Sequence, residues 1–276
     1  MVKLPHFYLK LNKDNSWHMD RPHFHEDVEF LIPVTSGDEM FVENNVYPLQ
    51  PGVMFIMPDA TLHKTLATSS YERYVLHVPT QVLAELSTPQ TDFLERINKA
   101  EHMIYLGDNA SYFIGLLQQM ERAHENHGNQ FGEDMEQYLL LITFLLKALS
   151  LSIARPSPHR TAAKGSNSIQ INQVLDYLQT HMSEKLALDD IAGSFYISKY
   201  HLSHCFKLAT GFSVMEYLIN IRIIKARQLL RDGMRVQDAG EAVGFQSNEH
   251  FIRTFSSITG ASPKKYTRRF LESDKI

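Results

Sequence analysis

Residues 244–266 read GFQSNEHFIRTFSSITGASPKKY and decide how the C-terminal part of this chain folds. Phe251 and Phe255 lie four residues apart, which places both side chains on one face of a helix. Ser247 stands just before this face, where its side chain can cap the start of the helix. The stretch therefore predicts a capped helix with an apolar side that packs in a core and a polar side that stays outside.

The same pattern occurs once earlier, in LDDIAGSFYISKYHLSHCFKLATG at residues 188–211. Phe206 precedes Gly211 by five residues, as Phe255 precedes Gly260, and Ser198 takes the capping position. A short helix with small residues precedes each turn, and these residues are Ala192 in the first copy and Ala239 and Ala242 in the second. Small residues allow two short helices to cross closely and present the second one to a major groove. The repeat therefore predicts two helix-turn-helix motifs.

This repeat resembles the DNA-binding domain of the AraC/XylS family of transcription regulators, over about residues 169 to 270. The matching residues are Gly244-Phe245, Phe251-Ile-Arg253-Thr-Phe255, Gly260-Ala-Ser262-Pro263 and Tyr266. The sequence departs from the family at Ser256, where lysine is usual, and at Gln237-Asp238-Ala239-Gly240, which replaces an isoleucine-containing helix start. The resemblance implies a dimeric bacterial regulator that binds double-stranded DNA and works with RNA polymerase.

The resemblance also assigns roles to residues of the two predicted recognition helices. Those expected to reach base edges are Tyr200, Ser203, His204, Asn248, Glu249 and His250. Those expected to bind phosphates are Lys199, Lys207 and Arg253. Asparagine can pair with adenine, glutamate can accept from cytosine, and serine can serve either. For any single position the alternative is a solvated surface residue, so the prediction is stronger for the set than for one member.

Seven segments with helical period and no strand pattern make up the second half. They are residues 169–182, 187–194, 198–209, 213–231, 235–243, 247–259 and 263–271. The long segment at 214–231 would join the two motifs so that they enter successive major grooves of one duplex, with DNA deformability contributing to specificity. RPSPHRTAAKGSNS at 155–168 has almost no apolar side chain and predicts a linker. We expect a sensor domain at 1–155, a linker at 156–168 and a DNA-binding domain at 169–272.

The first half has a different pattern, in which short apolar or alternating runs broken by turn residues extend from about Phe24 to Pro79. This pattern predicts an antiparallel sandwich or small barrel. Residues 81–99 and 110–125 then look helical, and 134–152 form a helix that is apolar on most sides. The cover for that helix could come from its own domain or from a second copy of the chain. The expected fold class is α+β, an N-terminal cupin-like barrel with appended helices followed by an all-α domain.

A histidine-rich pair of segments supplies the cupin-like part of this expectation. His23-x-His25-x3-Glu29 and Gly52-x5-Pro58-x-Ala60-x2-His63 resemble the two cupin motifs, although Ala60 replaces the usual glycine. On neighbouring strands, His23, His25, Glu29 and His63 could hold a divalent metal ion. They could equally contact a small-molecule effector, often a sugar in regulators of this kind, or be structural histidines. His77 and His102, which lack a shared spacing, are assigned to surface or core.

Composition and charge agree with a soluble regulator that binds a polyanion. Residues 1–166 carry 13 basic and 20 acidic residues, whereas 167–276 carry 14 and 11, so the net charge changes from −7 to +3. The single Cys205 forms no internal disulfide, and no secretion signal opens the sequence, which indicates the cytoplasm. The apolar run at 138–154 is shorter than a usual membrane span and contains Lys147, so we expect no membrane contact.

Two other functions are compatible with parts of this sequence. A metal-dependent cupin enzyme, such as an oxygenase or isomerase, would use the histidine motifs but gives no reason for two DNA-reading helix pairs. A regulator whose first half only dimerises would keep the helix pairs and bind no ligand. The hypothesis favoured by the sequence is a regulator in which an effector changes the packing of the sensor and thereby the DNA-binding units.

Overall fold

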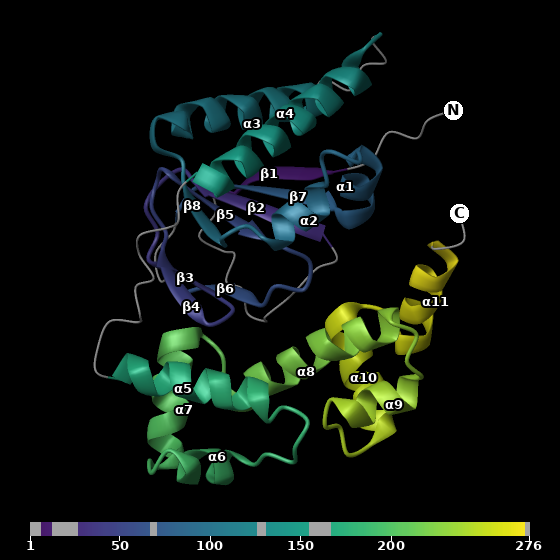
Figure 1. Ribbon diagram of the computed structural model, residues 1–276. Helices are drawn as coiled ribbons and strands as arrows, with labels where there is room; N and C mark the ends of the chain where they lie inside the picture. The colour runs from purple at the N-terminus through teal and green to yellow at the C-terminus, as the bar shows by residue number, and fades with distance from the viewer. Residues whose placement is uncertain (1–6, 13–26, 67–70, 126–130, 155–166, 274–276) are drawn as a thin grey trace.

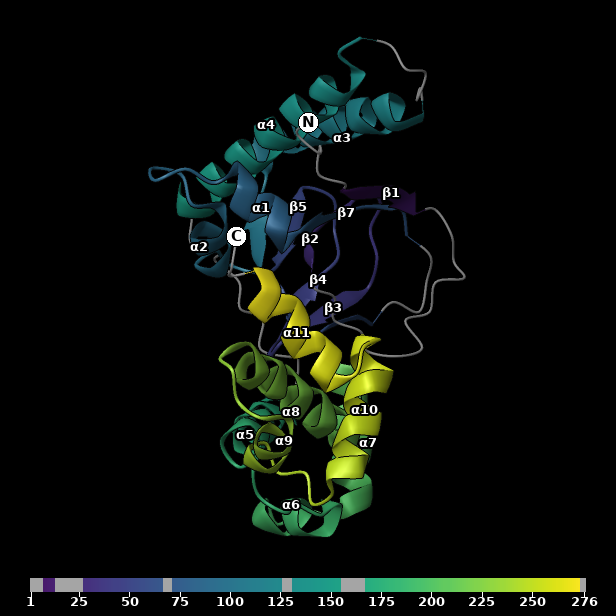
Figure 2. The ribbon, with the colours of Figure 1, turned by 90° about the vertical axis from the view of Figure 1, so that its right-hand side faces the viewer.

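The computed structural model describes residues 7–12, 27–66, 71–125, 131–154 and 167–273. A sheet-rich N-terminal half is followed by a helical C-terminal half, which confirms the predicted α+β class (Figure 1). Both views place helices on one side of the sheets and the helical half on the other (Figures 1 and 2). His23 and His25, and residues 156–166 of the linker predicted at 156–168, lie outside the described residues.

The described strands of the N-terminal half form two antiparallel sheets. The larger has the order β1-β7-β2-β5-β8, formed by Tyr8–Asn12, Arg73–Pro79, Asp27–Pro33, Val53–Met57 and Met103–Tyr105. The smaller has the order β4-β3-β6, formed by Asn45–Pro48, Glu39–Val42 and His63–Thr65. The two sheets share one core cluster, so they face each other as the predicted sandwich pattern requires. The narrower expectation of a cupin-like barrel stays a prediction.

Alternation along the strands gives each sheet two distinct faces. In β2, Phe30 points into the core under the N-terminal helices, whereas Glu29 and Leu31 point toward the smaller sheet. In β3, Met40 packs between the sheets, whereas Phe41 packs against the helical half. The smaller sheet is therefore buried on both faces, with the interior of the N-terminal half on one side and the helical half on the other.

In the part of the N-terminal half that the structure describes there are four α-helices, which are α1 (Thr80–Leu86), α2 (Phe93–Asn98), α3 (Ala110–Glu125) and α4 (Glu133–Ala154). The prediction of one helix over 81–99 was wrong, because Thr88 and Thr91 pair in a tight turn that separates α1 from α2. The sequence also gave no signal for β1 or β8. Both are short strands at the edges of the larger sheet, where few apolar residues are needed.

Helix α4 is buried on one side only. Phe144 packs edge-to-face on Phe30 of the sheet and on Phe113 of α3, at ring distances of 5.3 and 5.4 Å. On the opposite side Leu139 and Leu146 are 62% and 48% exposed, so the expectation of burial on most sides was wrong for a single chain. Among the helices that the structure describes, α4 is long and apolar enough to cross a membrane by length and composition, but its inner side is part of a protein core.

The helical half confirms the seven predicted segments to within about two residues. They are α5 (Asn167–Thr180), α6 (Leu188–Ser194), α7 (Lys199–Thr210), α8 (Val214–Arg231), α9 (Val236–Ala242), α10 (Asn248–Thr259) and α11 (Pro263–Ser273). Helix α8 begins with a capping box formed by Ser213 and Glu216. Its Arg222 donates to the carbonyl oxygens of Met182 and Glu184 at 2.7 and 2.6 Å. These bonds join α8 to the loop between α5 and α6, so the first motif and the linking helix form one packed unit.

Candidate functional site

The two predicted recognition helices, α7 and α10, are built alike. Ser198 accepts a hydrogen bond from the His201 amide at 3.2 Å, and Ser247 accepts one from the His250 amide at 3.4 Å. Each helix ends at a glycine in the left-handed conformation, Gly211 or Gly260. The predicted caps are therefore present at both helices, and each helix is fixed at the end that the family resemblance assigns to DNA.

Phenylalanines hold each recognition helix in a core, as the spacing predicts. Leu202 and Phe206 of α7 and Phe251 and Phe255 of α10 are fully buried. In the second copy Ala239 is buried but Ala242 is exposed, so the expected packing role of Ala242 was wrong. Gly240 allows the close approach instead, because a Cβ there would lie 2.8 Å from the Phe251 ring.

The candidate base-reading side chains lie on the outer sides of these helices. Tyr200 is 78% exposed, and the other exposed members are His204, Asn248, Glu249 and His250, while Ser203 is half-buried. The His250 ring also lies edge-on to Phe245 at 5.4 Å, which restricts its orientation. The candidate base-reading positions thus present mostly polar, accessible side chains, as contact with base edges requires, although Leu208 and Ile252 are also exposed on these helices.

The three candidate phosphate-binding residues are all exposed, but they differ in their neighbours. Lys199 forms an ion pair with Asp189 of α6 at 3.1 Å and lies 6.0 Å from the Tyr200 ring centre. Lys207 and Arg253 point away from the core at later turns of their helices. A phosphate would therefore have to compete with a carboxylate for Lys199.

A second candidate site lies between the two sheets. The carboxylate of Glu29 is 3.4 Å from Nε2 of His63 and 3.9 Å from Nε2 of His77, and Glu29 and His63 are almost fully buried. The other ring nitrogen of His63 is 2.9 Å from the carbonyl oxygen of Thr61, so a hydrogen bond there fixes the ring. The structure therefore brings Glu29 and His63 together, as the motif spacing predicts.

His77 is a member of this cluster that the sequence did not identify. It is the cross-strand partner of Glu29 between β2 and β7, and no local motif reports that pairing. Nearby, Arg73 lies 4.7 Å over the Tyr71 ring, and burial raises the pKa of the Tyr71 hydroxyl. The inner face of the larger sheet thus carries several polar groups in a largely apolar interior.

The donor chemistry at Glu29 and His63 suits a metal ion in part. A histidine that is held by a backbone carbonyl and turned toward a carboxylate is typical of metal sites. Within the described residues, however, no group of three or more histidine, cysteine or acidic side chains could hold an ion. Because His23 and His25 lie outside the described residues, the metal site stays a prediction.

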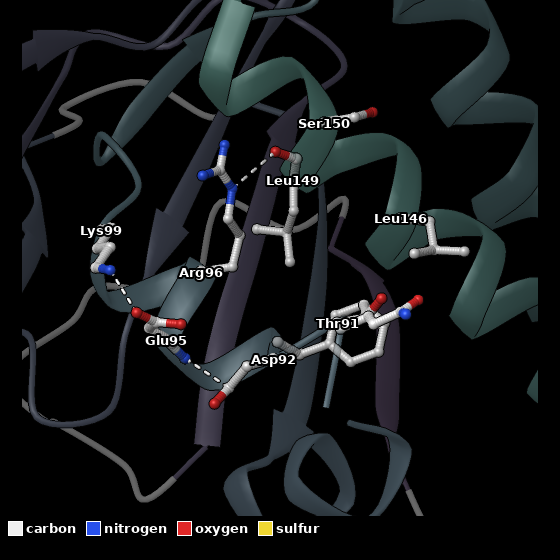
Figure 3. Close-up of a pocket in the computed structure, with 10 residues that line it drawn as sticks. Thr91, Asp92, Glu95, Arg96, Lys99, Leu146, Leu149 and Ser150 are labelled. Carbon is white, nitrogen blue, oxygen red and sulfur yellow. Dashed lines mark hydrogen bonds and ion pairs between the residues drawn. The ribbon is translucent and has the colours of Figure 1, made fainter. Parts of the chain in front are cut away.

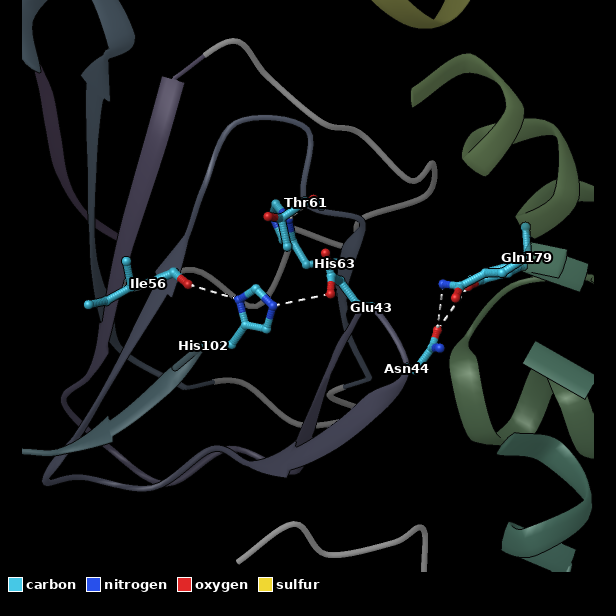
Figure 4. A network of polar contacts seen from close by, with 8 residues as sticks. Glu43, Asn44, Ile56, Thr61, His63, His102 and Gln179 are labelled. Carbon is cyan, nitrogen blue, oxygen red and sulfur yellow. Dashed lines mark hydrogen bonds and ion pairs between the residues drawn. The ribbon is translucent and has the colours of Figure 1, made fainter. Parts of the chain in front are cut away.

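Another polar network joins the β3–β4 turn to both halves of the chain (Figure 4). His102 lies 3.3 Å from the Glu43 carboxylate and 3.2 Å from the carbonyl oxygen of Ile56. Burial opposes a charge on His102, but the hydrogen bond and the charge of Glu43 raise its pKa, and the same bond lowers the pKa of Glu43. The adjacent Asn44 accepts a hydrogen bond from Gln179 of α5 at 3.2 Å.

A surface pocket between α2 and α4 contains none of the predicted site residues (Figure 3). Its charged groups are already engaged, since Lys99 pairs with Glu95 and Arg96 donates to the Leu149 carbonyl oxygen at 3.5 Å. Asp92 accepts from the Glu95 amide and caps α2. The pocket is therefore a structural groove beside the exposed side of α4.

Comparison with known proteins places the helical half in a recognised group. Residues 191–269 match the model of a helix-turn-helix domain. The transcriptional activator RhaS of Citrobacter koseri is 29% identical over 88% of this chain and 86% of its own length. The MmsAB operon regulatory protein of Pseudomonas aeruginosa is 27% identical over 50% of this chain and 44% of its own. The chain spans about half the length of most of the curated relatives that it matches. It covers 44% of the MmsAB operon regulatory protein and 48% of the Msm operon regulatory protein of Streptococcus mutans.

Solved structures also match the helical half. The C-terminal domain of AraT, a response regulator from Geobacillus stearothermophilus, is 29% identical and has a TM-score of 0.37. The match covers 38% of this chain and 88% of that domain.

Proposed function

We propose that the chain is a transcription regulator of the AraC/XylS family, and that it binds specific sites on double-stranded DNA in response to a small-molecule effector. The observation that carries the proposal is the pair of capped helices α7 and α10, each with a buried phenylalanine face and an exposed polar face. We further propose a sensor domain at 1–155, a linker at 156–168 and a DNA-binding domain at 169–272, in a cytoplasmic protein that works with RNA polymerase.

Helix α8 sets the separation of the two reading helices. Its 18 residues give a length of about 27 Å, which is comparable with one turn of B-DNA. We propose that α7 and α10 enter successive major grooves on one side of the duplex. Asn248 and Glu249 are the strongest candidates for base contacts, because both are exposed at the start of α10 and have the donor and acceptor groups that adenine and cytosine match.

The experiment that tests DNA binding is selection of fragments from a genomic library by the full-length protein at fixed salt. The triple variant H204A/N248A/E249A should lose discrimination between selected and random fragments, at about 1 to 3 kcal/mol per lost base contact. The control is S257A, an exposed residue on the last turn of α10, which should change nothing. Intact discrimination in a folded triple variant would refute the assignment of these helices.

A second arm separates phosphate contacts from base contacts. Replacing Lys207 or Arg253 by alanine should weaken binding to all sequences alike and reduce the slope of log affinity against log salt by about one each. Lys199 should have the smaller effect, because it already pairs with Asp189. Altered sequence preference without a change in slope would contradict the phosphate role.

We propose the Glu29, His63 and His77 cluster as the polar part of the effector site. The support is the burial of two of these groups at 3.4 Å from each other within an apolar interior, where polar groups fix the orientation of a ligand. An effector that binds the folded protein raises its free energy of unfolding by about 2.7 kcal/mol at a concentration of 100 Kd, and therefore raises the melting temperature. Sugars and divalent metal ions form the first panel, and a shift that persists in H63L would place the ligand elsewhere.

We propose that the chain is a homodimer that pairs through α4. Met135, Leu139, Ile142 and Leu146 follow one another at intervals of four, three and four residues, the spacing of a coiled-coil seam. Three of them are about half exposed or more. Sedimentation of L139E/L146E should give a monomer, whereas K147E, one residue off the seam, should remain a dimer; a dimer in both variants would refute the seam.

The relatives favour a regulator over a metal-dependent enzyme, because their names describe activators and operon regulators. One relative, AdaA of Bacillus subtilis, is named as both a transcriptional activator and a DNA repair enzyme. That name belongs to a protein of which this chain covers 51%.

A further inference from the structure

We infer that the segment from Pro58 to Thr65, which connects β5 to β6, couples the interior of the sensor half to both helix-turn-helix units, with Asp59 and Lys64 as positioning residues. The inference rests on the proposed DNA-binding function and adds a route for its regulation. It follows from the contacts that successive residues of this short segment make on opposite sides of the smaller sheet.

His63 and Lys64 are neighbours in the chain but face opposite sides of β6. His63 points inward and lies 3.4 Å from the Glu29 carboxylate. Lys64 points outward, donates to the Gly211 carbonyl oxygen at 2.8 Å and lies 5.3 Å over the Phe212 ring. Because His63 and Lys64 are adjacent on one strand, a ligand that shifts the β6 backbone at His63 also shifts Lys64 and its contacts with the connection between α7 and α8.

Asp59 makes the corresponding contact at the other end of α8. Its carboxylate accepts from Arg227 at 2.8 Å and from Arg231 at 2.6 Å. Arg227 is buried and also donates to the Tyr266 hydroxyl of α11 at 3.0 Å. One sensor carboxylate therefore binds α8 at the point where it packs against the second helix-turn-helix unit.

The turn between Asp59 and His63 is short and is closed by a backbone hydrogen bond. The Thr61 amide donates to the Pro58 carbonyl oxygen at 3.1 Å, and Ala60 has a left-handed φ of 65°. Such a tight turn restricts the movement of Asp59 and His63 relative to each other. Movement of His63 is therefore transmitted to Asp59 and not absorbed by the loop.

The helical half packs against the outer face of the smaller sheet. Phe41, Val46 and Leu62 pack in one cluster with Phe212 and Tyr217. At the β3–β4 turn, Tyr217 donates to Asn44 at 3.0 Å (Figure 4 shows the neighbouring Gln179 contact). The base-reading residues of α7 and α10 stay exposed in this arrangement, so the contact orients the DNA-binding units and does not cover them.

Hydrogen exchange measured by mass spectrometry on the full-length protein tests the coupling without knowledge of the effector. D59N should speed exchange in the second half of α8 about tenfold, and K64M should do so near the start of α8, because each loses a charged hydrogen bond. H63Q changes only the inner side, yet it should also speed exchange in α8. The controls are D108N, which changes an exposed acid in the turn after β8, and M103L, which changes a buried residue of β8 between the sheets.

The outcomes separate the coupling from the proposed function. Exchange in α8 that responds to H63Q but not to M103L supports the coupling, whereas an H63Q effect confined to β2, β6 and β7 overturns it. On a selected DNA fragment, D59N and K64M should change affinity about fivefold or more, although neither residue lies on a recognition helix. Unchanged affinity in both variants overturns the regulatory role. A wild-type protein that binds no DNA refutes the proposed function, while the exchange data still decide the coupling.

Discussion

Replacing Gly244 by alanine should destabilise the helical half by about 2 to 5 kcal/mol. Gly244 has a φ of 90°, and an L-residue in left-handed backbone costs about 1 to 2 kcal/mol. A Cβ there would also lie 2.7 Å from the carbonyl oxygens of Met182 and Ser183. These atoms cannot retreat easily, because Arg222 binds the Met182 oxygen at 2.7 Å, so overpacking adds about 1 to 3 kcal/mol.

The first helix-turn-helix motif supplies a matched test of this reasoning. Tyr196 occupies the equivalent turn position, since its amide bonds to Gly193 as the Gly244 amide bonds to Glu241. Tyr196 has a φ of 55° and is 97% exposed, so no packing is lost when it is replaced. Y196G should therefore stabilise the protein slightly, by less than about 1 kcal/mol, because relief of strain is offset by the entropy of glycine.

Urea unfolding followed by far-ultraviolet circular dichroism measures both changes, because the helical half contributes most of the helix signal. The reasoning predicts opposite signs at the same turn position. A G244A protein as stable as the wild type to within about 0.5 kcal/mol would refute the steric argument. A large loss of stability in Y196G would show that the exposed tyrosine has a packing partner in solution.

Three further perturbations have defined outcomes. Ala60 has left-handed backbone, so A60G should raise the free energy of unfolding by less than about 1 kcal/mol in urea titrations, because the relief of strain is partly offset by the entropy of glycine, and a loss would disprove the strain. H102Q should cost most stability between about pH 4.5 and 6.5. Because the His102 pKa is raised, its stabilisation of the fold is present at low pH and is lost as the pH rises; because the Glu43 pKa is lowered, its stabilisation is present at higher pH and is lost as the pH falls. Melting curves whose difference from wild type does not depend on pH would contradict the pair. F144A should cost about 3 to 5 kcal/mol by calorimetry, because the ring is fully buried between two phenylalanines, and a loss under about 1 kcal/mol would mean that α4 repacks.

The helical half followed closely from the sequence, because its signals are local. Ser198 and Ser247 cap helices at the predicted positions, and the phenylalanine spacing identified the buried faces of α7 and α10. The packing role of Ala242 was wrong, because the crossing of α9 and α10 depends on which helix face meets Phe251, and that face contains Gly240.

The N-terminal half was less predictable from the sequence. The motif spacing predicted that Glu29 and His63 lie together, and the structure confirms this. His77 joins them through strand pairing between β2 and β7, which the spacing of residues in the sequence does not predict. For α4 the sequence left open whether the second side meets its own domain or a second copy of the chain, and in the single chain that side is exposed. An almost continuous apolar run looks alike whether its second side meets a domain core or a second copy of the chain.

The sequence by itself determined the α+β class, the repeated helix-turn-helix motif and the polar residues at its reading surface, because helix caps and apolar periods act within a few residues of each other. Only the tertiary structure decided that Asp59 meets Arg227 and Arg231, and that Lys64 meets Gly211. Asp59 and Arg227 are 168 residues apart in the chain, and Lys64 and Gly211 are 147 residues apart. They meet because the smaller sheet has a second apolar face to bury, and its burial against α8 is a property of the folded chain that no local pattern contains.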